Sequence, residues 1–331
     1  MRALLLLASA LALGGCETVA YYSQATGGQL AIAARARPVA QVLEDPEVDA
    51  ALKARLRAAT TLRDYAISAL GLPDEGAYRS YAALDRPYAV WNVVAAPEFS
   101  LDPVQSCFPV AGCVAYRGYF AREAAQRYAA GLRAQGYDVV VYGVAAYSTL
   151  GWFDDPLLST FIRQPDPALA RLLFHEMAHH VAYVKDDSTF NESFAVAVER
   201  EGLRRWLRDQ GTERDAAQVA SARAQREKFA RLVEVTRERL RALYAQGLPP
   251  EQARREKREA LAALRPWLER FPGLESPEPN NAFLASYATY TERLPAFERL
   301  LAEAGGDLPR FYARVRELAE LPRAERDAAL R

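Results

Sequence analysis

Histidine and cysteine are scarce in this chain of 331 residues, and neither sign of charge is in excess. It contains three histidines and three cysteines, and its 42 lysines and arginines balance 42 aspartates and glutamates to a net charge of zero. The balance gives no reason to expect a nucleic-acid partner or strong attraction to an anionic surface. Because no cysteine lies near the histidines, a structural zinc site, which is usually closed by cysteines, is not expected there.

The three histidines are concentrated in one short block, residues 174–180. On an α-helix, residues four apart share a face, so the imidazoles of His175 and His179 can bind one ion. Glu176 points to the flank of that face, where its carboxylate can reach a water on the ion. This is the His-Glu-x-x-His pattern of zinc hydrolases, with two ligands and a general base in five residues. The alternative is a helix whose histidines only cap or pack.

Glu192 is the expected third ligand, because the lengths of two predicted helices place it close to His179. The sequence predicts a helix from Asp166 to about Val184, and a second helix capped by Ser188. At 1.5 Å per residue, His179 lies about 7.5 Å before the end of the first helix, and Glu192 about 6 Å into the second. If the helices are antiparallel, the two side chains stand level. Two imidazoles and a carboxylate, with a fourth position left for water, are typical of a catalytic zinc site.

The block resembles that of the gluzincin metallopeptidases, in which a glutamate on the following helix completes the metal site. Asn191 and Glu192 match the Asn-Glu pair of that group. Glu199 matches a carboxylate that, in the aminopeptidase N branch, holds a ligand histidine by its free ring nitrogen. The alternative for Glu199 is a solvated helix carboxylate. Only 12 residues separate His179 from Glu192, fewer than in those enzymes, so the rim of the cleft is expected to differ.

Residues 1–16 predict a bacterial export signal. Arg2 supplies the positive end, and the apolar run over 3–13 is too short to span a bilayer. The run ends in Leu-Gly-Gly-Cys, which resembles the lipoprotein processing box, so Cys16 is expected to be acylated and to anchor the chain to a lipid bilayer. Glu17 in the next position favours, by resemblance, the outer over the inner membrane. We therefore expect a lipid-anchored protein of the cell envelope that faces the periplasm.

The two remaining cysteines, Cys107 and Cys113, close a short loop. In an exported protein, such a pair predicts a disulfide. Metal ligation by the two thiols is the alternative.

The residue patterns predict an α+β fold that is predominantly helical. It consists of a zincin-like catalytic core over 17–210, with a small sheet, and a charged helical region over 211–331 that packs back on the active site. Strand-like sequence occurs at 88–96, 114–120 and 138–144, and two long charged helices are predicted at 213–245 and 250–271.

Two further segments are candidates for contact with a substrate. Residues 147–156 connect the sheet to the metal helix and are the candidate substrate wall, because in zincins the preceding strand pairs with an extended peptide. Asp154 or Asp155 could receive a substrate α-amine, although Asp-Asp-Pro is also a common turn. In gluzincins the oxyanion donor is often a tyrosine beyond the metal site, which makes Tyr290, rather than Tyr287, the candidate. The alternative is that both tyrosines pack in the core.

The layout as a whole resembles a family of proteobacterial lipoproteins assigned as zinc aminopeptidases. The shared features are the processing box, residues 147–156, the His-Glu-Met-Ala-His block, residues 191–195 and residues 280–282. The resemblance implies a membrane-anchored peptidase that acts on peptide substrates with Zn²⁺ as its cofactor. A hydrolase of cell-wall peptides or amides and a non-catalytic envelope scaffold are the alternatives. The intact Glu176 argues against a scaffold, which has no need of a general base.

Overall fold

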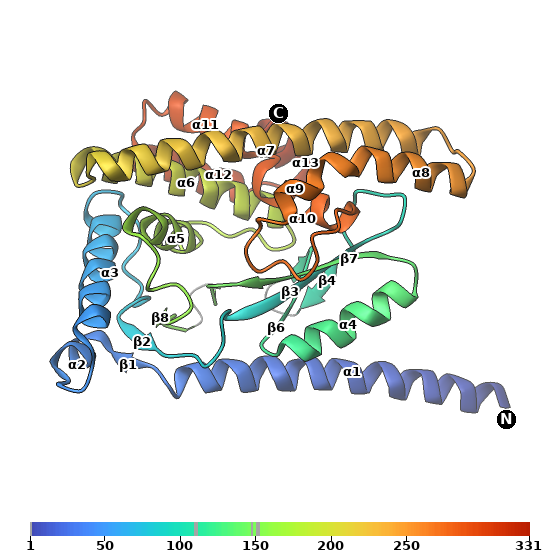
Figure 1. Cartoon of the computed structure of the whole chain (residues 1–331), viewed down its shortest axis with the longest axis horizontal. Helices are drawn as coiled ribbons and strands as arrows, with labels where there is room; N and C mark the ends of the chain where they lie inside the picture. The colour runs from blue at the N-terminus through green and yellow to red at the C-terminus, as the bar shows by residue number, and fades with distance from the viewer. Residues whose placement is uncertain (1, 109–111, 147, 150–152) are drawn as a thin grey trace.

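The computed structural model describes residues 2–108, 112–146, 148–149 and 153–331, with side chains from Thr18 onward. The fold is α+β and predominantly helical, which confirms the predicted class at that level (Figure 1). The helices are α1 (Arg2–Ala33), α2 (Val39–Glu44), α3 (Ala50–Ser68), α4 (Arg122–Ala134), α5 (Asp166–Ala178), α6 (Ser188–Asp209), α7 (Glu213–Ala245), α8 (Pro250–Leu261), η1 (Ala262–Leu264), α9 (Arg265–Leu268), α10 (Asn281–Thr291), α11 (Leu294–Glu303), α12 (Leu308–Glu320) and α13 (Arg323–Ala329). The strands are β1 (Arg37–Pro38), β2 (Ser80–Ala82), β3 (Val90–Ala96), β4 (Ser106–Phe108), β5 (Gly112–Val114), β6 (Arg117–Tyr119), β7 (Asp138–Val144) and β8 (Leu157–Leu158).

The main sheet has the strand order β6-β3-β7 and is antiparallel. All seven residues of its central strand β3 are buried, as an almost continuous apolar run predicts for a strand covered on both faces. Val93 and Ala95 pack in one cluster with α4, while Val94 and Ala96 pack in another with α10, because successive side chains point to opposite faces. Two smaller sheets have the orders β1-β2-β8 and β4-β5.

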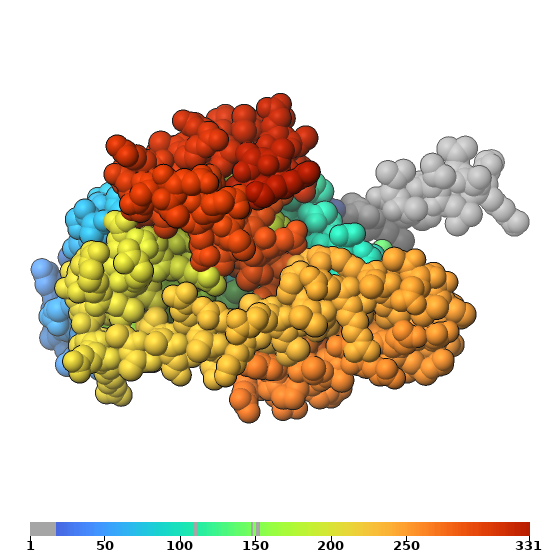
Figure 2. All heavy atoms as spheres, turned by 90° about the horizontal axis from the view of Figure 1, so that it is seen from above, coloured from blue at the N-terminus to red at the C-terminus, as the bar shows by residue number. Residues whose placement is uncertain are grey.

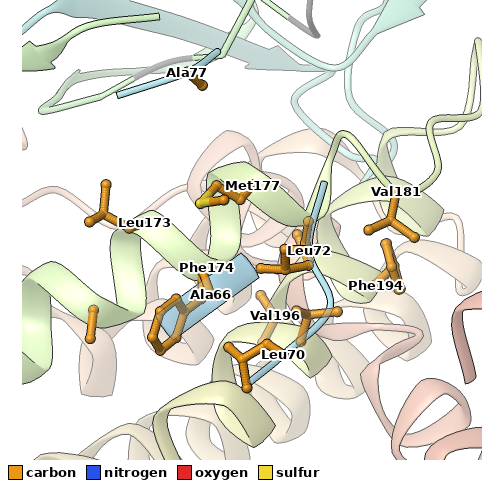
Figure 3. Packing of buried hydrophobic residues seen from close by; sticks show 14 of the residues in the cluster. Ala66, Leu70, Leu72, Ala77, Leu173, Phe174, Met177, Val181, Phe194 and Val196 are labelled. Carbon is orange, nitrogen blue, oxygen red and sulfur yellow. The ribbon is translucent and has the colours of Figure 1, made fainter. Parts of the chain in front are cut away.

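The core beneath the histidine block lies between α5, α6 and the end of α3 (Figure 3). Phe174 and Met177 of α5 are buried in one cluster with Phe194 of α6. Gly202 permits the close approach of the two helices, since a Cβ there would lie 2.8 Å from Leu70 Cδ1 and from Phe174 Cδ2. The side chains of α6 that face α5 are thereby held at a short distance from the histidines.

Two predicted boundaries near the histidine block are wrong. α5 ends at Ala178 and does not continue to Val184. The following residues turn back because the carboxamide of Asn191 donates to the carbonyl of Val184 (2.8 Å) and accepts from its N–H (2.7 Å). These bonds supply the partners that backbone groups need when they leave a helix. The N-cap of α6 is Asp187 rather than Ser188, because the Asp187 carboxylate accepts a backbone N–H of the first turn.

Two other predicted elements are divided in the structure. The strand expected over 114–120 is split between β5 and β6. The helix expected over 250–271 is divided into three shorter helices, α8, η1 and α9. Pro266 lies in the first turn of α9. Proline has no N–H to donate inside a helix, which favours a new start at this position.

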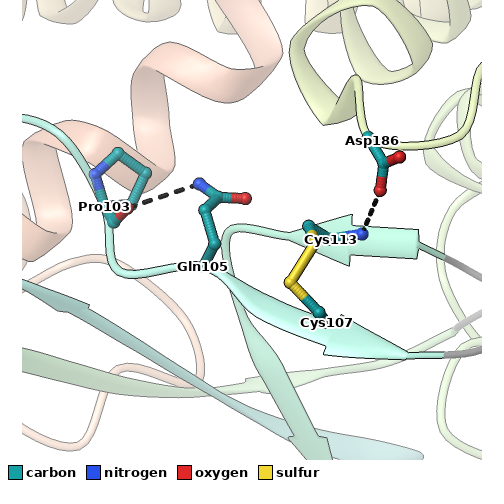
Figure 4. Close-up of a disulfide and its surroundings, with 5 residues drawn as sticks. All are labelled: Pro103, Gln105, Cys107, Cys113 and Asp186. Atoms are coloured by element: carbon teal, nitrogen blue, oxygen red, sulfur yellow. Dashed lines mark hydrogen bonds between the residues drawn. A yellow bond between two sulfur atoms is a disulfide. The ribbon is translucent and has the colours of Figure 1, made fainter.

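The hairpin of β4 and β5 carries a disulfide between Cys107 and Cys113, which are paired across the two strands (Figure 4). The Cys113 N–H donates to the Asp186 carboxylate. This bond attaches the hairpin to the segment that joins α5 and α6.

The helices beyond residue 211 cover one side of the molecule, with α7 and α8 next to each other and α11 to α13 beside them (Figure 2). Beneath them α10 contacts α6, β3 and β7. The division at residues 16 and 210 stays a prediction. In the part of the chain that the structure describes, no helix combines the length and apolar character needed to cross a bilayer.

Candidate metal centre

The end of α5 and the start of α6 bring two histidines and one carboxylate together. The rings of His175 and His179 lie 5.1 Å apart, centroid to centroid. Glu192 Oε2 lies 3.2 Å from His175 Nε2 and 3.8 Å from His179 Nε2. The three ligating atoms all lie within 4.8 Å of one another, so this group could hold a metal ion.

The early end of α5 does not disturb the relation between the two histidines. His179 is the C-cap residue and keeps right-handed helical angles (φ −61°, ψ −20°), so it still lies one turn beyond His175. The hydrogen bonds from Asn191 to Val184 then bring the chain back. Glu192, the next residue, faces the two imidazoles. The Asn-Glu pair therefore both closes the turn and supplies the third candidate ligand.

Glu199 and Arg171 form a second layer behind His175. Glu199 Oε2 lies 3.1 Å from His175 Nδ1, and Arg171 Nε donates to Glu199 Oε1 at 2.5 Å. Glu199 is buried, which raises its pKa, but the Arg171 charge and the His175 hydrogen bond outweigh burial and lower the pKa. The carboxylate therefore stays ionised and fixes the orientation of the His175 ring.

The surroundings of His175 favour a cation between His175, His179 and Glu192. Each of its nitrogens faces a carboxylate oxygen, that of Glu192 or that of Glu199. Burial alone would lower the pKa of His175, but the two hydrogen bonds raise it to about 10. A neutral imidazole carries one N–H and can donate to only one carboxylate. A metal ion beside Nε2 would let this nitrogen and the Glu192 oxygen act together as electron donors, with the proton on Nδ1.

Glu176 lies beside the group without belonging to it. It lines the same cavity as His175, His179 and Glu192, a cavity of about 580 Å³. Burial, followed by the negative charges of Glu192, Asp155 and Glu199, raises the pKa of Glu176 to about 7 despite the opposing effect of His175. A carboxyl group with this pKa can both accept and donate a proton near neutral pH.

The other two histidines have different surroundings. Burial lowers the pKa of His179 to about 4, and among the described residues its buried Nδ1 has no hydrogen-bond partner. A neutral ring is the form that binds a metal. His180 lies outside the group, because its Nδ1 pairs with Glu75 Oε2 at 2.8 Å.

The two candidate tyrosines occupy different environments. Tyr290 lines the cavity, and its ring centroid lies 6.3 Å from that of His175. Tyr287 packs instead against Phe229 and Phe283 in the second hydrophobic cluster. The negative charge of Glu192, and then burial, raise the pKa of Tyr290 well above its ordinary value. Its hydroxyl therefore keeps its proton and can donate it in a hydrogen bond.

The structure brings only part of the predicted substrate wall to the cavity. Ser148, Thr149 and Phe153 line it, while Tyr147 and residues 150–152 lie outside the described residues. Neither Asp154 nor Asp155 lines it.

Asp155 has a structural role within that segment. Its side chain is buried and accepts the Thr149 N–H at 2.7 Å, while the Tyr78 N–H donates to its backbone carbonyl. Burial raises the pKa of Asp155. Asp155 therefore holds this loop in place, as expected of the turn alternative.

Sequence reasoning missed several residues of the site, among them Arg171 and part of α1. Arg171 lies four residues before His175, so its place on the same helix face was available from spacing alone. Tyr21, Tyr22 and Ala25 of α1 also line the cavity, and no local signal pointed to them.

The fold and the geometry thus define an α+β protein with a buried group that could hold a metal ion next to an additional acidic residue. A family model described as "Putative aminopeptidase" matches residues 20–330, and the chain belongs to this family. The family supports a peptidase-like function that acts on peptide substrates. No curated protein and no solved structure matches the chain.

Replacing Glu199 tests the second layer. Glu199→Ala removes the carboxylate that orients His175, and loss of such a partner lowers metal affinity about 10- to 100-fold. The measurement is competition for zinc with a chelator of known affinity. Glu201→Ala is the matched control on the same helix, since Glu201 pairs with Arg204 and Arg205. Equal zinc affinity in Glu199→Ala and the wild type would show that Glu199 does not support the ligand.

Proposed function

We propose that this protein is a zinc-dependent peptidase of the aminopeptidase type, with Zn²⁺ held by His175, His179 and Glu192. The observation that carries the proposal is the convergence of these three donors in a buried pocket. Three nitrogen and oxygen donors are the protein ligands of a catalytic zinc site, in which the fourth position belongs to water or substrate. The arrangement of a histidine helix followed by a glutamate helix supports a zincin-like core.

Glu176 is the proposed general base. When bound in such a set, zinc lowers the pKa of a coordinated water from 15.7 to about 7 in favourable cases, which supplies a nucleophile at neutral pH. Glu176 accepts a proton from the attacking water and passes it to the leaving amine. Without a bound cation, burial raises the pKa of Glu176 to about 7. The positive charge of zinc would lower this pKa and favour the carboxylate form that accepts the proton.

Tyr290 is the proposed oxyanion donor. It reaches the cavity from α10, which packs against α6 and the main sheet. A protonated phenol held by packed helices needs little rearrangement when negative charge develops on the attacked carbonyl.

Cleavage at a free amino end is proposed from the family description. Asp155 does not provide an anchor for a substrate ammonium, because its side chain binds within its own loop. In the described part of the cavity wall, the carboxylates are Glu176 and Glu192. Both already have roles in the proposed metal binding and proton transfer, so the described part of the cavity wall shows no separate carboxylate for a substrate's α-ammonium.

We also propose that Cys16 is acylated and anchors the protein to a membrane of the cell envelope, the outer membrane by preference, facing the periplasm. The Cys107–Cys113 disulfide supports an oxidising compartment.

The experiment that tests the peptidase proposal replaces Glu176 by glutamine. Glu176→Gln keeps the three ligands, so zinc content should equal that of the wild type. Turnover should fall about a hundredfold to ten-thousandfold, because the proton acceptor is lost. Zinc is measured by elemental analysis and turnover on matched peptides with free and acetylated amino ends. Full activity of Glu176→Gln would refute the mechanism, and equal rates on both peptides would refute the aminopeptidase assignment.

Tyr290→Phe should lower kcat about a hundredfold while KM changes little, because an oxyanion donor acts mainly in the transition state. Tyr287→Phe is the matched control, since Tyr287 packs against Phe229 and does not line the cavity. Steady-state kinetics on one peptide would compare both variants with the wild type. Similar kcat values for the two variants would remove Tyr290 from the mechanism.

Cys16→Ser tests the membrane anchor. The wild type should be recovered in the membrane fraction with the mass of an acylated amino-terminal cysteine. The variant should lack the acyl mass, because serine offers no thiol to the lipid-transfer reaction. Mass spectrometry of both forms provides the measurement, and an unacylated wild type would contradict the anchor.

A further inference from the structure

Helix α1 forms one side of the cavity that contains the metal-binding group. Tyr21, Tyr22 and Ala25 line this cavity together with His175 and Glu192. In Figure 1, α1 runs along the side of the molecule on which α4 and β6 lie. A segment more than a hundred residues before the metal ligands in the sequence is therefore part of the same site.

Gln24 attaches α1 to the outer edge of β6. The Gln24 Nε2 group donates to the Gly118 carbonyl (3.5 Å), and the Phe120 N–H donates to Gln24 Oε1 (3.1 Å). Gly118 and Phe120 are two residues apart, so these two backbone groups point to the same edge, where a further strand could pair. The Gln24 carboxamide forms hydrogen bonds with both of these backbone groups, so α1 covers this edge of the sheet.

Aromatic packing holds the same part of α1. The Tyr21 ring stacks on Phe108 with centroids 5.3 Å apart, and the Arg117 guanidinium lies 4.1 Å from the Tyr21 centroid. Burial raises the pKa of Tyr21 to about 12. Seven residues after Tyr21, Gly28 permits close packing, because a Cβ there would lie only 2.1 Å from Phe120 Cγ. Specific contacts therefore fix α1 as a wall of the cavity.

The chemistry of this wall is apolar and aromatic. Tyr21, Tyr22 and Ala25 of α1 face a cavity whose other lining residues include Phe108, Phe120 and Phe153. Among the described lining residues, the carboxylates are those of Glu176 and Glu192, and lysine and arginine do not occur. Away from the metal group, a charged substrate side chain would lose its water and meet no counter-charge among the described lining residues, because the nearby Arg117 guanidinium lies over the Tyr21 ring and does not line the cavity. Such a loss of hydration is unfavourable.

We propose that Tyr21, Tyr22 and Ala25 form part of the subsite that receives a substrate side chain, and that this subsite selects large apolar or aromatic residues. The proposal rests on the proposed peptidase function and adds a substrate class to it. When an apolar side chain packs against such a wall, its free energy falls roughly in proportion to the apolar area removed from water. The amino-terminal helix is thus a specificity element of the enzyme.

A charge placed on α1 gives the sharpest test. Ala25→Arg puts a cation into the cavity wall, whereas Thr26→Arg puts the same cation on the exposed face of the same helix, outside that cavity. The full-length protein is assayed on matched peptides with phenylalanine, glutamate or lysine on either side of the scissile bond. The wild type should prefer phenylalanine. Ala25→Arg should raise kcat/KM for glutamate relative to phenylalanine about fivefold, the upper range for a part-exposed ion pair, and Thr26→Arg should leave the ratio unchanged.

A second variant separates this effect from a loss of folding. Gln24→Ala frees the edge of β6, so α1 is held less firmly. KM for the phenylalanine peptide should rise while kcat and zinc content stay unchanged, because the metal ligands are not touched. An unchanged KM in Gln24→Ala, an unchanged ratio in Ala25→Arg, or an equal shift in Thr26→Arg would overturn the proposal.

A failure of the peptidase function would look different. If the zinc-loaded wild type cleaves none of the peptides, the proposed function fails, and the subsite is tested by binding alone. Calorimetry with peptides whose scissile amide is reduced to an amine compares phenylalanine and glutamate on the wild type and Ala25→Arg. Tighter binding of phenylalanine to the wild type, weakened in Ala25→Arg, supports the subsite. Equal dissociation constants refute it.

Discussion

The hydrogen bonds between Asn191 and the backbone of Val184 are the constraint on which the site depends. These bonds hold the segment that connects α5 and α6 against the start of α6, and they set the position at which α6 begins to pack on α5. Because Glu192 follows Asn191 directly, the same turn places its carboxylate opposite His175 and His179. Gly202 then lets the two helices continue in close contact over the core. A small change in this turn would move Glu192, the third candidate ligand, and not only a surface loop.

Concentrated negative charge is the second feature of the centre. Glu192, Glu199 and Glu176 are gathered around His175, and Arg171 contributes a cation through its ion pair with Glu199. Burial makes this arrangement costly unless a positive charge is present. The proposed zinc ion would supply that charge, and it would also lower the raised pKa of the surplus carboxylate, Glu176, toward the ionised form that accepts a proton.

Distant parts of the chain complete the cavity around this centre. α1 contributes Tyr21 and Tyr22, and α10 contributes Tyr290. Both are attached to the main sheet, α1 through Gln24 at the edge of β6 and α10 through contacts with β3 and β7. The sheet therefore holds the proposed substrate wall of α1 and the proposed oxyanion donor of α10 in place beside the helices that carry the candidate metal ligands.

The sequence by itself determined what depends on neighbours a few residues apart. The spacing of His175 and His179, the strand over 138–144 and the long helix over 213–245 all follow from local periodicity, and the structure has these two elements with the predicted bounds. Only the tertiary structure decided where α5 ends, that Asp155 serves its own loop, and that α1 lines the cavity. The end of α5 and the place of α1 depend on hydrogen bonds from another segment, and no periodic pattern in one segment records such a partner. The role of Asp155 depends on a bond across an irregular loop, which has no periodic pattern either.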